Sequence, residues 1–413
     1  MLKSPTARRQ IGLVFILIVL LYLVLAFAFY AGIASKVLGA NDYFSRWMGA
    51  RLFFQQGLDP YSEQVTQQIQ LGMFGQLVPP NQDQVAFAYP FYAVFFTYPL
   101  LNLPFALASS FWIALLFMLI GAAAIVLALH FDWQPSVWWF PALLAFALIP
   151  YPSMRGFFLG QYALLVTACL AFALLLIKQG RDDWAGCLLA ICTVKPHIIV
   201  VVLAVILGWG AWHRRWGLIR GFAAVLAVLV LASMVFLPGW IGEFVQAVGR
   251  YKGYTDLGPP IQVLCETFLP LAVADPLSTL LSILLFGALG YGWWRTRGTT
   301  WNDFLPTVEL ALIVTTMAMI RTATADQTLL LVPWVHWLST WVRSGRQRLA
   351  LLTGGVVMVA PWILFLTTLG PDSKEAPIAT TATVTLTLLA YLVIHRNHWF
   401  PVRRTEVSEN VLA

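Results

Sequence analysis

The chain has 413 residues, of which 60% are hydrophobic and 10% charged, and its mean hydropathy is +0.78. A soluble globular protein carries about 25% charged residues, so this composition excludes that class and indicates a polytopic membrane protein. The net charge of +7 is better explained by basic loops on a phospholipid surface than by nucleic-acid binding. The four cysteines lie almost entirely in apolar stretches without CxxC or metal-ligand spacing. We therefore expect no zinc site, no disulfide framework and no cofactor.

The first hydrophobic stretch, 11–33, is too long for a signal peptide and lacks a suitable cleavage site, so it is predicted to be a retained first span. Each span needs about 20 apolar residues. Further candidates are 104–128, 136–152, 160–178, 217–237, 274–294, 304–320, 326–343, 348–368 and 376–395.

Two segments leave the topology open. Residues 87–102 are aromatic and short, whereas 184–212 suffices for one tilted helix or for two short helices broken at Lys195-Pro196, because proline removes an intrahelical hydrogen bond. Either 87–102 crosses and 184–212 is a single helix, or 87–102 is re-entrant and 184–212 is a hairpin. Both alternatives give an all-α fold of about twelve transmembrane helices, with both termini on one side.

Basic residues indicate the orientation of this single integral membrane domain. The clusters that mark the cytoplasmic face are Lys3/Arg8/Arg9, Arg214/Arg215/Arg220, Arg295/Arg297, Arg343/Arg346/Arg348 and Arg396/Arg403/Arg404. We therefore expect a multi-pass protein of the cell membrane, with both termini in the cytoplasm and a cytoplasmic tail at 396–413. The extracytoplasmic segments are then 35–86, 239–272, 321–326 and 370–375, and the spans after the first lie within 87–395.

The outer segment 35–86 is too long for a simple connection, and long ordered loops are usually functional. Asp42 is positioned to N-cap a juxtamembrane helix from Tyr43 to about Gln55 that lies on the outer leaflet. A turn containing Asp59 and a second polar helix from about Ser62 to Met73 follow. The Asp42 carboxylate is either only this cap or a site residue that acts on a lipid head group.

The second constellation is Thr193-Val194-Lys195-Pro196-His197, which places a cation and an imidazole inside an apolar stretch. Ionisable residues within a span are costly and usually face a cavity or a partner. Lys195 is suited to pair with a lipid phosphate, and His197 to donate a hydrogen bond to it. The alternative is a snorkelling lysine at the interface beside a histidine with a structural partner.

The third constellation is the late outer turn Arg321-Thr322-Ala323-Thr324-Ala325-Asp326-Gln327. Asp326 is either an N-cap or a site residue, and Arg321 is either an interface anchor or a phosphate ligand. Arg155 is a weaker candidate, since only one topology places it outside. In the loop from Trp240 to Glu266, aromatic and polar side chains such as Tyr254 suit sugar contacts and equally suit an interfacial belt.

The order and spacing of several short motifs resembles glycosyltransferase family 87 of the GT-C superfamily, from about residue 11 to 340. These motifs are Asp42-Tyr43-Phe44, Gly57-Leu58-Asp59-Pro60-Tyr61, Tyr89-Pro90, Tyr98-Pro99-Leu100, Gly160-Gln161, Ala185-Gly186 leading to Lys195-Pro196, and Asp326 before an apolar stretch ending in Pro333. That family comprises α-mannosyltransferases that use a polyprenyl-phosphate-mannose donor.

The resemblance implies an inverting, metal-independent transfer of mannose to a lipid or glycan acceptor on the extracytoplasmic face, with Asp42 as general base. The residues that would bind the donor phosphate are Lys195, Arg321 and His197. Contacts to the sugar or acceptor would come from Asp326, Gln327, Tyr43, Asp59 and Tyr254. Many members carry a histidine motif at the late outer turn. This chain has no histidine there before His336, so Asp326 or Gln327 would have to take that role.

Two other functions remain open on the sequence. One is a transferase with another polyprenyl-linked donor, such as an arabinofuranosyl pentose, because no position distinguishes the axial hydroxyl of mannose. The other is a polytopic lipid or solute transporter, with polar residues in broken helices near the midplane. The chain has no convincing internal repeat, and the candidate residues gather at one face, which favours the transferase.

Overall fold

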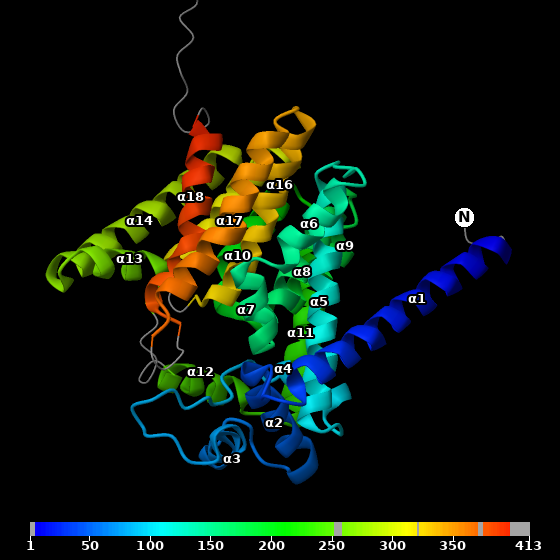
Figure 1. Ribbon diagram of the computed structural model, residues 1–413, viewed down its shortest axis with the longest axis vertical. Helices are drawn as coiled ribbons and strands as arrows, with labels where there is room; N and C mark the ends of the chain where they lie inside the picture. The colour runs from blue at the N-terminus through cyan, green and yellow to red at the C-terminus, as the bar shows by residue number, and fades with distance from the viewer. Residues whose placement is uncertain (1–4, 252–257, 320–321, 371–374, 397–413) are drawn as a thin grey trace, which may run out of the picture.

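The computed structural model describes residues 5–251, 258–319, 322–370 and 375–396. Regular structure in these residues is helical, as the predicted all-α class requires (Figure 1). The α-helices in the first half of the chain are α1 (Pro5–Phe29), α2 (Asn41–Gln56), α3 (Glu63–Phe74), α4 (Ala93–Thr97), α5 (Phe105–His130), α6 (Trp139–Leu148), α7 (Tyr151–Leu159), α8 (Tyr162–Lys178), α9 (Asp182–Ile191) and α10 (Val200–Trp212). Those in the second half are α11 (Trp216–Phe236), α12 (Trp240–Tyr251), α13 (Pro260–Phe268), α14 (Leu271–Thr296), α15 (Trp301–Ala318), α16 (Leu331–Arg343), α17 (Gln347–Thr367) and α18 (Ala382–Ile394).

Six stretches of the described residues are long and apolar enough to cross a bilayer. They are Arg9–Ala34, Phe105–His130, Trp216–Phe236, Leu271–Thr296, Gln347–Thr367 and Pro377–Ile394. A seventh results if α6 and α7, which are bent by 54° relative to each other, form one broken span. The protein is therefore polytopic, as predicted, but the described residues do not contain the expected twelve or so crossings.

Several of the other apolar stretches predicted as spans are shorter helices enclosed by protein. Those at 160–178 and 304–320 form α8 and α15, in which most side chains are buried. A helix that is apolar on all sides either faces lipid or lies inside a protein core, and the sequence does not separate these cases. The predicted span at 136–152 is also interrupted, because α6 ends before Pro150 and α7 continues in a new direction.

Residues 184–212 form a hairpin, so the single-helix alternative is wrong. Arg215, just after α10, donates from Nε to Oδ2 of Asp182 at the start of α9 over 2.8 Å. The start of α9 and the end of α10 therefore lie next to each other. The break around Lys195-Pro196 forms the apex between these two arms. With 10 and 13 residues, the arms are only about 15 and 20 Å long, which makes the hairpin re-entrant.

The segment 87–102 does not cross the membrane. It contains the 5-residue helix α4 and the 3₁₀ turn Tyr98–Leu100, far shorter than a span requires. The Tyr92 hydroxyl donates to the carbonyl oxygen of Thr193 over 3.0 Å. This segment therefore packs beside the apex of the α9–α10 hairpin.

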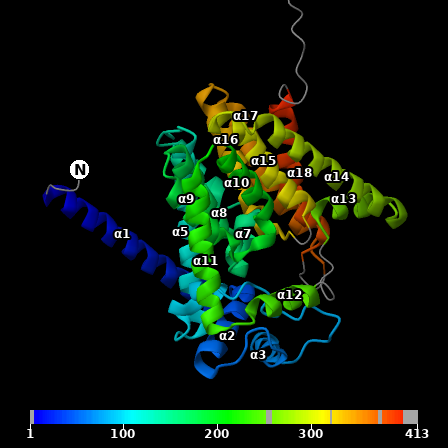
Figure 2. The ribbon, with the colours of Figure 1, turned by 180° about the vertical axis from the view of Figure 1, so that it is seen from behind.

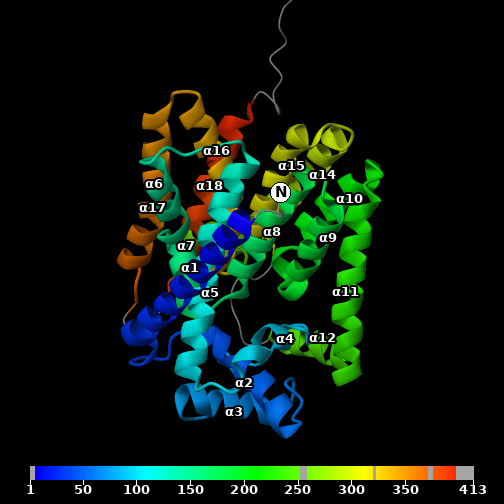
Figure 3. The ribbon, with the colours of Figure 1, turned by 90° about the vertical axis from the view of Figure 1, so that its right-hand side faces the viewer.

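The molecule has two chemically different ends. In Figures 1 and 3, α2, α3, α4 and α12 gather at one end, and the α10–α11, α14–α15 and α16–α17 turns lie at the other. Those three turns carry Arg214/Arg215, Arg295/Arg297 and Arg343/Arg346. Basic turns are thus separated from the segment 35–86, as expected for a membrane protein with one positively charged face.

The first span leans away from the bundle. Figures 1 and 2 show α1 diverging from the other helices, in contact with them only toward its C-terminal end. There Tyr22 donates to the carbonyl oxygen of Phe111 over 3.1 Å, and Phe29 packs on Phe117. The rest of the helix exposes large apolar side chains from Ile11 to Val24, as a lipid-facing span does.

The two helices predicted in the outer segment are present as α2 and α3. Gly57 ends α2 in the left-handed conformation, with φ at 69°, and the Ser62 hydroxyl caps α3 by accepting from the Val65 N–H. The expected contact of α2 with the leaflet is wrong for its apolar face. Phe44 and Trp47 are buried and pack against Phe105 of α5, so that face lies inside the protein.

Candidate functional site

The N-terminus of α2 docks on the turn between α7 and α8. The Ala40 N–H donates to the carbonyl oxygen of Phe158 over 2.8 Å, and Gly160 adopts the left-handed conformation with φ at 63°. A Cβ on Gly160 would lie 2.8 Å from the Cβ atoms of both Ala40 and Tyr43, so only glycine permits this approach. The docking brings the first turn of α2 beside Gln161.

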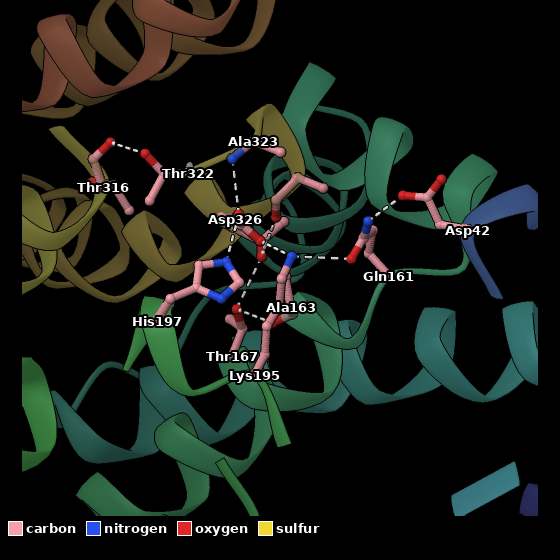
Figure 4. A network of polar contacts seen from close by, with 12 residues as sticks. Asp42, Gln161, Ala163, Thr167, Lys195, His197, Thr316, Thr322, Ala323 and Asp326 are labelled. Atoms are coloured by element: carbon pink, nitrogen blue, oxygen red, sulfur yellow. Dashed lines mark hydrogen bonds and ion pairs between the residues drawn. The ribbon is translucent and has the colours of Figure 1, made fainter. Parts of the chain in front are cut away.

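Gln161 joins groups from separate parts of the chain (Figure 4). Its Nε2 donates to Oδ2 of Asp42. Its Oε1 accepts from Nζ of Lys195 at 3.0 Å and from Nη2 of Arg46 at 3.3 Å. The side chain is buried, so these hydrogen bonds are shielded from water and hold it in one orientation.

Lys195 reaches this network from the apex of the α9–α10 hairpin. Its ammonium donates to Oδ1 of Asp326 as well as to Gln161, and its side chain is only 5% exposed, against 0% for Asp326. A lysine this deeply buried needs a neutralising partner. The alternative of a snorkelling lysine at the interface is therefore wrong.

Asp326 accepts hydrogen bonds both from Lys195 and from the backbone of its own turn. It lies in the 3₁₀ segment Thr324–Leu330, where its Oδ2 accepts from the Ala323 N–H at 2.9 Å. The same oxygen is 3.9 Å from Nε2 of His197, whose side chain is 40% exposed. As Figure 4 shows, His197 approaches Asp326 beside Lys195. One carboxylate therefore connects a buried cation with an accessible imidazole.

Arg46 contributes a second buried cation, one turn along α2 from Asp42. Its guanidinium lies 4.2 Å from the ring centre of Tyr89 and 4.9 Å from that of Tyr162. It donates to the Gly160 carbonyl oxygen at 3.3 Å, to the Tyr89 hydroxyl and to Gln161. Burial alone would lower the pKa of Arg46, but Tyr89 and Asp42 raise it above its ordinary value. Within the described residues Arg46 forms no ion pair, so its charge acts on Gln161 and Asp42.

The predicted N-cap role of Asp42 is wrong. Ala40 is the N-cap of α2, and Asp42 lies in the first turn of the helix. The Asp42 side chain accepts from Gln161 through Oδ2, while Oδ1 has no hydrogen-bond partner among the residues that the structure describes. The residue is only partly buried. A carboxylate with one anchored and one available oxygen, at a helix N-terminus that stabilises its charge, is suited to accept a proton.

Tyr43 and Asp59 have structural partners in this state. Tyr43 is 0% exposed and its ring stacks on Trp112, with centroids 4.9 Å apart. Its predicted contact with a sugar is therefore not compatible with the packing. Oδ1 of Asp59 accepts from the Tyr61 N–H at 2.9 Å, the hydrogen bond of a turn aspartate.

Of the remaining candidate residues, some lie near the hydrogen-bond network around Gln161 and others lie outside it. Gln327 follows Asp326, is buried, and donates to the Thr380 carbonyl oxygen. Nε of Arg155 in α7 lies 3.2 Å from Oε2 of Glu375, and Oε1 of Glu375 accepts from Thr324 of the Asp326 turn. His336 bonds to Glu309, a structural contact in the helix bundle. Arg321 and Tyr254 lie outside the described residues.

Gln161 and Arg46 are the residues of this site that the sequence did not identify. Gly160-Gln161 stood out only as a motif, and Arg46 only as part of the stretch that contains Asp42. The spacing of four residues places Asp42 and Arg46 on one face of a helix, which is the available signal for Arg46. Nothing local points to Gln161, because its three partners lie in two segments distant in sequence, α2 and the apex of the α9–α10 hairpin.

The fold is that of a polytopic all-α membrane protein. Its buried charged residues Arg46, Lys195 and Asp326 come from separate segments and are joined in one hydrogen-bond network with Gln161. Residues 87–261 match glycosyltransferase family 87. The chain thus contains a glycosyltransferase family 87 domain and is a membrane glycosyltransferase, which confirms the resemblance within that segment. The match includes Gln161, Lys195 and His197, whereas Asp42 and Asp326 lie on either side of it. No curated protein and no solved structure matches the chain significantly.

Proposed function

We propose that the protein is an inverting glycosyltransferase that moves mannose from a polyprenyl-phosphate donor to a lipid or glycan acceptor on the extracytoplasmic face. Asp42 is the general base. The observation that carries this proposal is the state of the Asp42 carboxylate: Gln161 holds Oδ2, and Oδ1 has no partner in the described part of the chain. A turn residue or a cap accepts from a nearby backbone N–H, as Oδ1 of Asp59 does from Tyr61, whereas Asp42 is held by a side chain from a distant segment.

The reaction needs one proton acceptor and a way to stabilise the leaving group. As the acceptor hydroxyl attacks the anomeric carbon, Oδ1 of Asp42 takes its proton. The bond from the anomeric carbon to the phosphate oxygen breaks, and the polyprenyl phosphate leaves with the bonding electrons from the opposite face. One displacement inverts the anomeric centre, so a β-linked donor gives an α-linked product.

Lys195 and His197 are the described groups suited to the leaving phosphate. Lys195 is neutralised by Asp326, so the pair presents little net charge to a bound phosphate. His197 is 40% exposed and adjoins the same carboxylate, which places a hydrogen-bond donor on the accessible side of the pair. A phosphate at His197 would receive a direct hydrogen bond from the imidazole.

The orientation follows from the separation of charge between the two ends. The basic turns at the end opposite α2 and α3 belong in the cytoplasm by the positive-inside rule, which leaves the end with α2 outside (Figure 1). Polyprenyl-linked sugars serve transfer on that side of the membrane because nucleotide sugars are confined to the cytoplasm.

The decisive experiment incubates the purified protein with polyprenyl-phosphate-mannose and candidate lipid acceptors. The variant Asp42→Asn keeps the shape of the side chain and removes the base, and we expect transfer to fall at least a hundredfold. The matched control is Glu63→Gln, which changes an exposed carboxylate in the same outer segment and should retain near-normal kcat. Full activity in Asp42→Asn would refute the assigned base.

The donor arm of the experiment separates the remaining alternatives. Polyprenyl-phosphate-arabinofuranose replaces the mannose donor under the same conditions, and its preferential use would make the protein a pentosyltransferase. Lack of transfer from either donor, combined with substrate-dependent flux in reconstituted vesicles, would identify a transporter.

A further inference from the structure

The hydrogen bonds around Gln161 permit one orientation of its amide. Oε1 faces Nζ of Lys195 at 3.0 Å and Nη2 of Arg46 at 3.3 Å, both cationic groups that only donate. Nε2 faces the Asp42 carboxylate, which only accepts when ionised. Turning the amide around would set its NH₂ group against two cations and its oxygen against an anion. The chemistry of the three partners therefore determines which end of the amide reaches Asp42.

We propose that Gln161 is a positioning residue for the transfer reaction, which holds Oδ2 of Asp42 so that Oδ1 is presented to the acceptor hydroxyl. This inference rests on the proposed role of Asp42 as base. Gln161 touches neither donor nor acceptor in this scheme. It links the carboxylate to the charges of Lys195 and Arg46 without placing a cation directly on Asp42, which would hold the carboxylate too tightly to accept a proton.

Arg46 makes this arrangement rigid. The residue is 1% exposed, and its guanidinium lies against Tyr89 and Tyr162 and donates to the Gly160 carbonyl oxygen as well as to Gln161. The Tyr162 hydroxyl is in turn held by the Ala93 carbonyl oxygen at 2.9 Å. Gln161 thus accepts hydrogen bonds from two fixed cations: Arg46, which packs between aromatic rings, and Lys195 at the hairpin apex. Its own freedom to rotate is small, so it fixes the carboxylate that it binds.

The test uses the variant Gln161→Glu. A glutamate has the same shape and still accepts from Lys195 and Arg46, so the protein should fold. The end that faces Asp42 changes from a donor into an acceptor, and the two carboxylates must then share a proton. We expect the acidic limb of the pH profile of kcat/KM to move upward by at least about one pH unit, because like charges raise the proton affinity of the pair.

The second variant is Gln161→Met, which retains volume but has neither donor nor acceptor. Here kcat should fall about tenfold or more while KM for the acceptor changes less than threefold, since binding contacts are untouched. Thermal unfolding of both variants in detergent identifies any loss of folded protein. The matched control is Gln67→Glu in α3, which adds the same charge at an exposed glutamine and should leave the pH profile unchanged.

The outcomes separate this inference from the proposed function. If Asp42→Asn is inactive while Gln161→Glu and Gln161→Met keep the wild-type kcat and acidic limb, Asp42 remains the base and the positioning role of Gln161 is wrong. If Asp42→Asn is fully active, the base assignment fails and the role of Gln161 fails with it. An upward shift in Gln161→Glu together with a low kcat in Gln161→Met supports both.

Discussion

Lys195 donates to Asp326 across 131 positions of sequence, and the two side chains are 5% and 0% exposed. Such a pair stabilises little in itself, because removing two charges from water offsets their attraction. Removing one partner destabilises the protein strongly, because the remaining charge stays buried without a counter-ion. The contact therefore acts as a constraint that brings the hairpin apex and the late turn together.

We expect Lys195→Met and Asp326→Asn each to lower the free energy of unfolding by about 3–5 kcal/mol. The first variant leaves the buried Asp326 carboxylate without its counter-ion, and the second leaves the buried Lys195 ammonium without one. The double variant should recover part of that stability and none of the transfer activity. Thermal unfolding in detergent and the transfer assay measure these effects. Asp132→Asn, which breaks the exposed ion pair of Lys178, is the control and should have little effect. Equal losses in the single and double variants would contradict the prediction.

Gly160→Ala should destabilise the protein and separate Asp42 from Gln161. A methyl group there meets two Cβ atoms at 2.8 Å in addition to the strain of a φ of 63°, for a combined cost of about 2–4 kcal/mol. The comparison is Gly180→Ala, where φ is 72° but no atom lies within 4 Å. That variant bears the backbone strain alone and should retain normal kcat. A melting temperature of Gly160→Ala equal to that of Gly180→Ala would show that the close approach is unimportant.

The orientation can be measured by cysteine labelling with a membrane-impermeant maleimide. Gln67→Cys in α3 should react in intact cells, because it is exposed at the end that we assign to the outside. Gln179→Cys and Ser344→Cys lie in exposed turns at the basic end and should react only after the membrane is opened. The unsubstituted chain measures the background, which would come from the partly exposed Cys187, because Cys169, Cys192 and Cys265 are buried. Labelling of Ser344→Cys in intact cells would invert the orientation.

Glu309→Gln tests a polar cluster that the transfer reaction does not use. The Glu309 carboxylate is buried and bonds to His336, to His395 at 3.1 Å and to Trp337 at 3.1 Å, which joins α15, α16 and the end of α18. Replacing it with an amide presents an NH₂ group to one of these donors, and we expect the free energy of unfolding to fall by about 1–3 kcal/mol.

In that variant kcat and KM of the folded protein should stay within twofold of wild type. The matched control is Glu63→Gln in α3, an exposed carboxylate whose loss should not change the melting temperature. A large change in KM would mean that the cluster influences the site after all.

Local chemistry was sufficient for several features of the fold. Proline, capping and left-handed glycine act within a few residues, and they account for the Lys195-Pro196 break, the helices α2 and α3, and the end of α2 at Gly57. The separation of basic turns from the segment 35–86 also follows from composition along the chain. By contrast, the Asp42 cap was wrong because Ala40, held by Phe158 from another segment, took that position.

By itself the sequence determined that the chain is helical and crosses the membrane several times, that the segment 35–86 carries Asp42, and that the chain resembles glycosyltransferase family 87. Hydropathy, helix signals and short motifs are properties of neighbouring residues, so they can be recognised without a structure. Only the tertiary structure decided which apolar helices lie inside the bundle, that 184–212 folds back on itself, and that Gln161 connects Asp42 with Lys195 and Arg46. Those facts depend on contacts between distant segments, where the choice between lipid, protein and a buried ion pair is made by packing and desolvation.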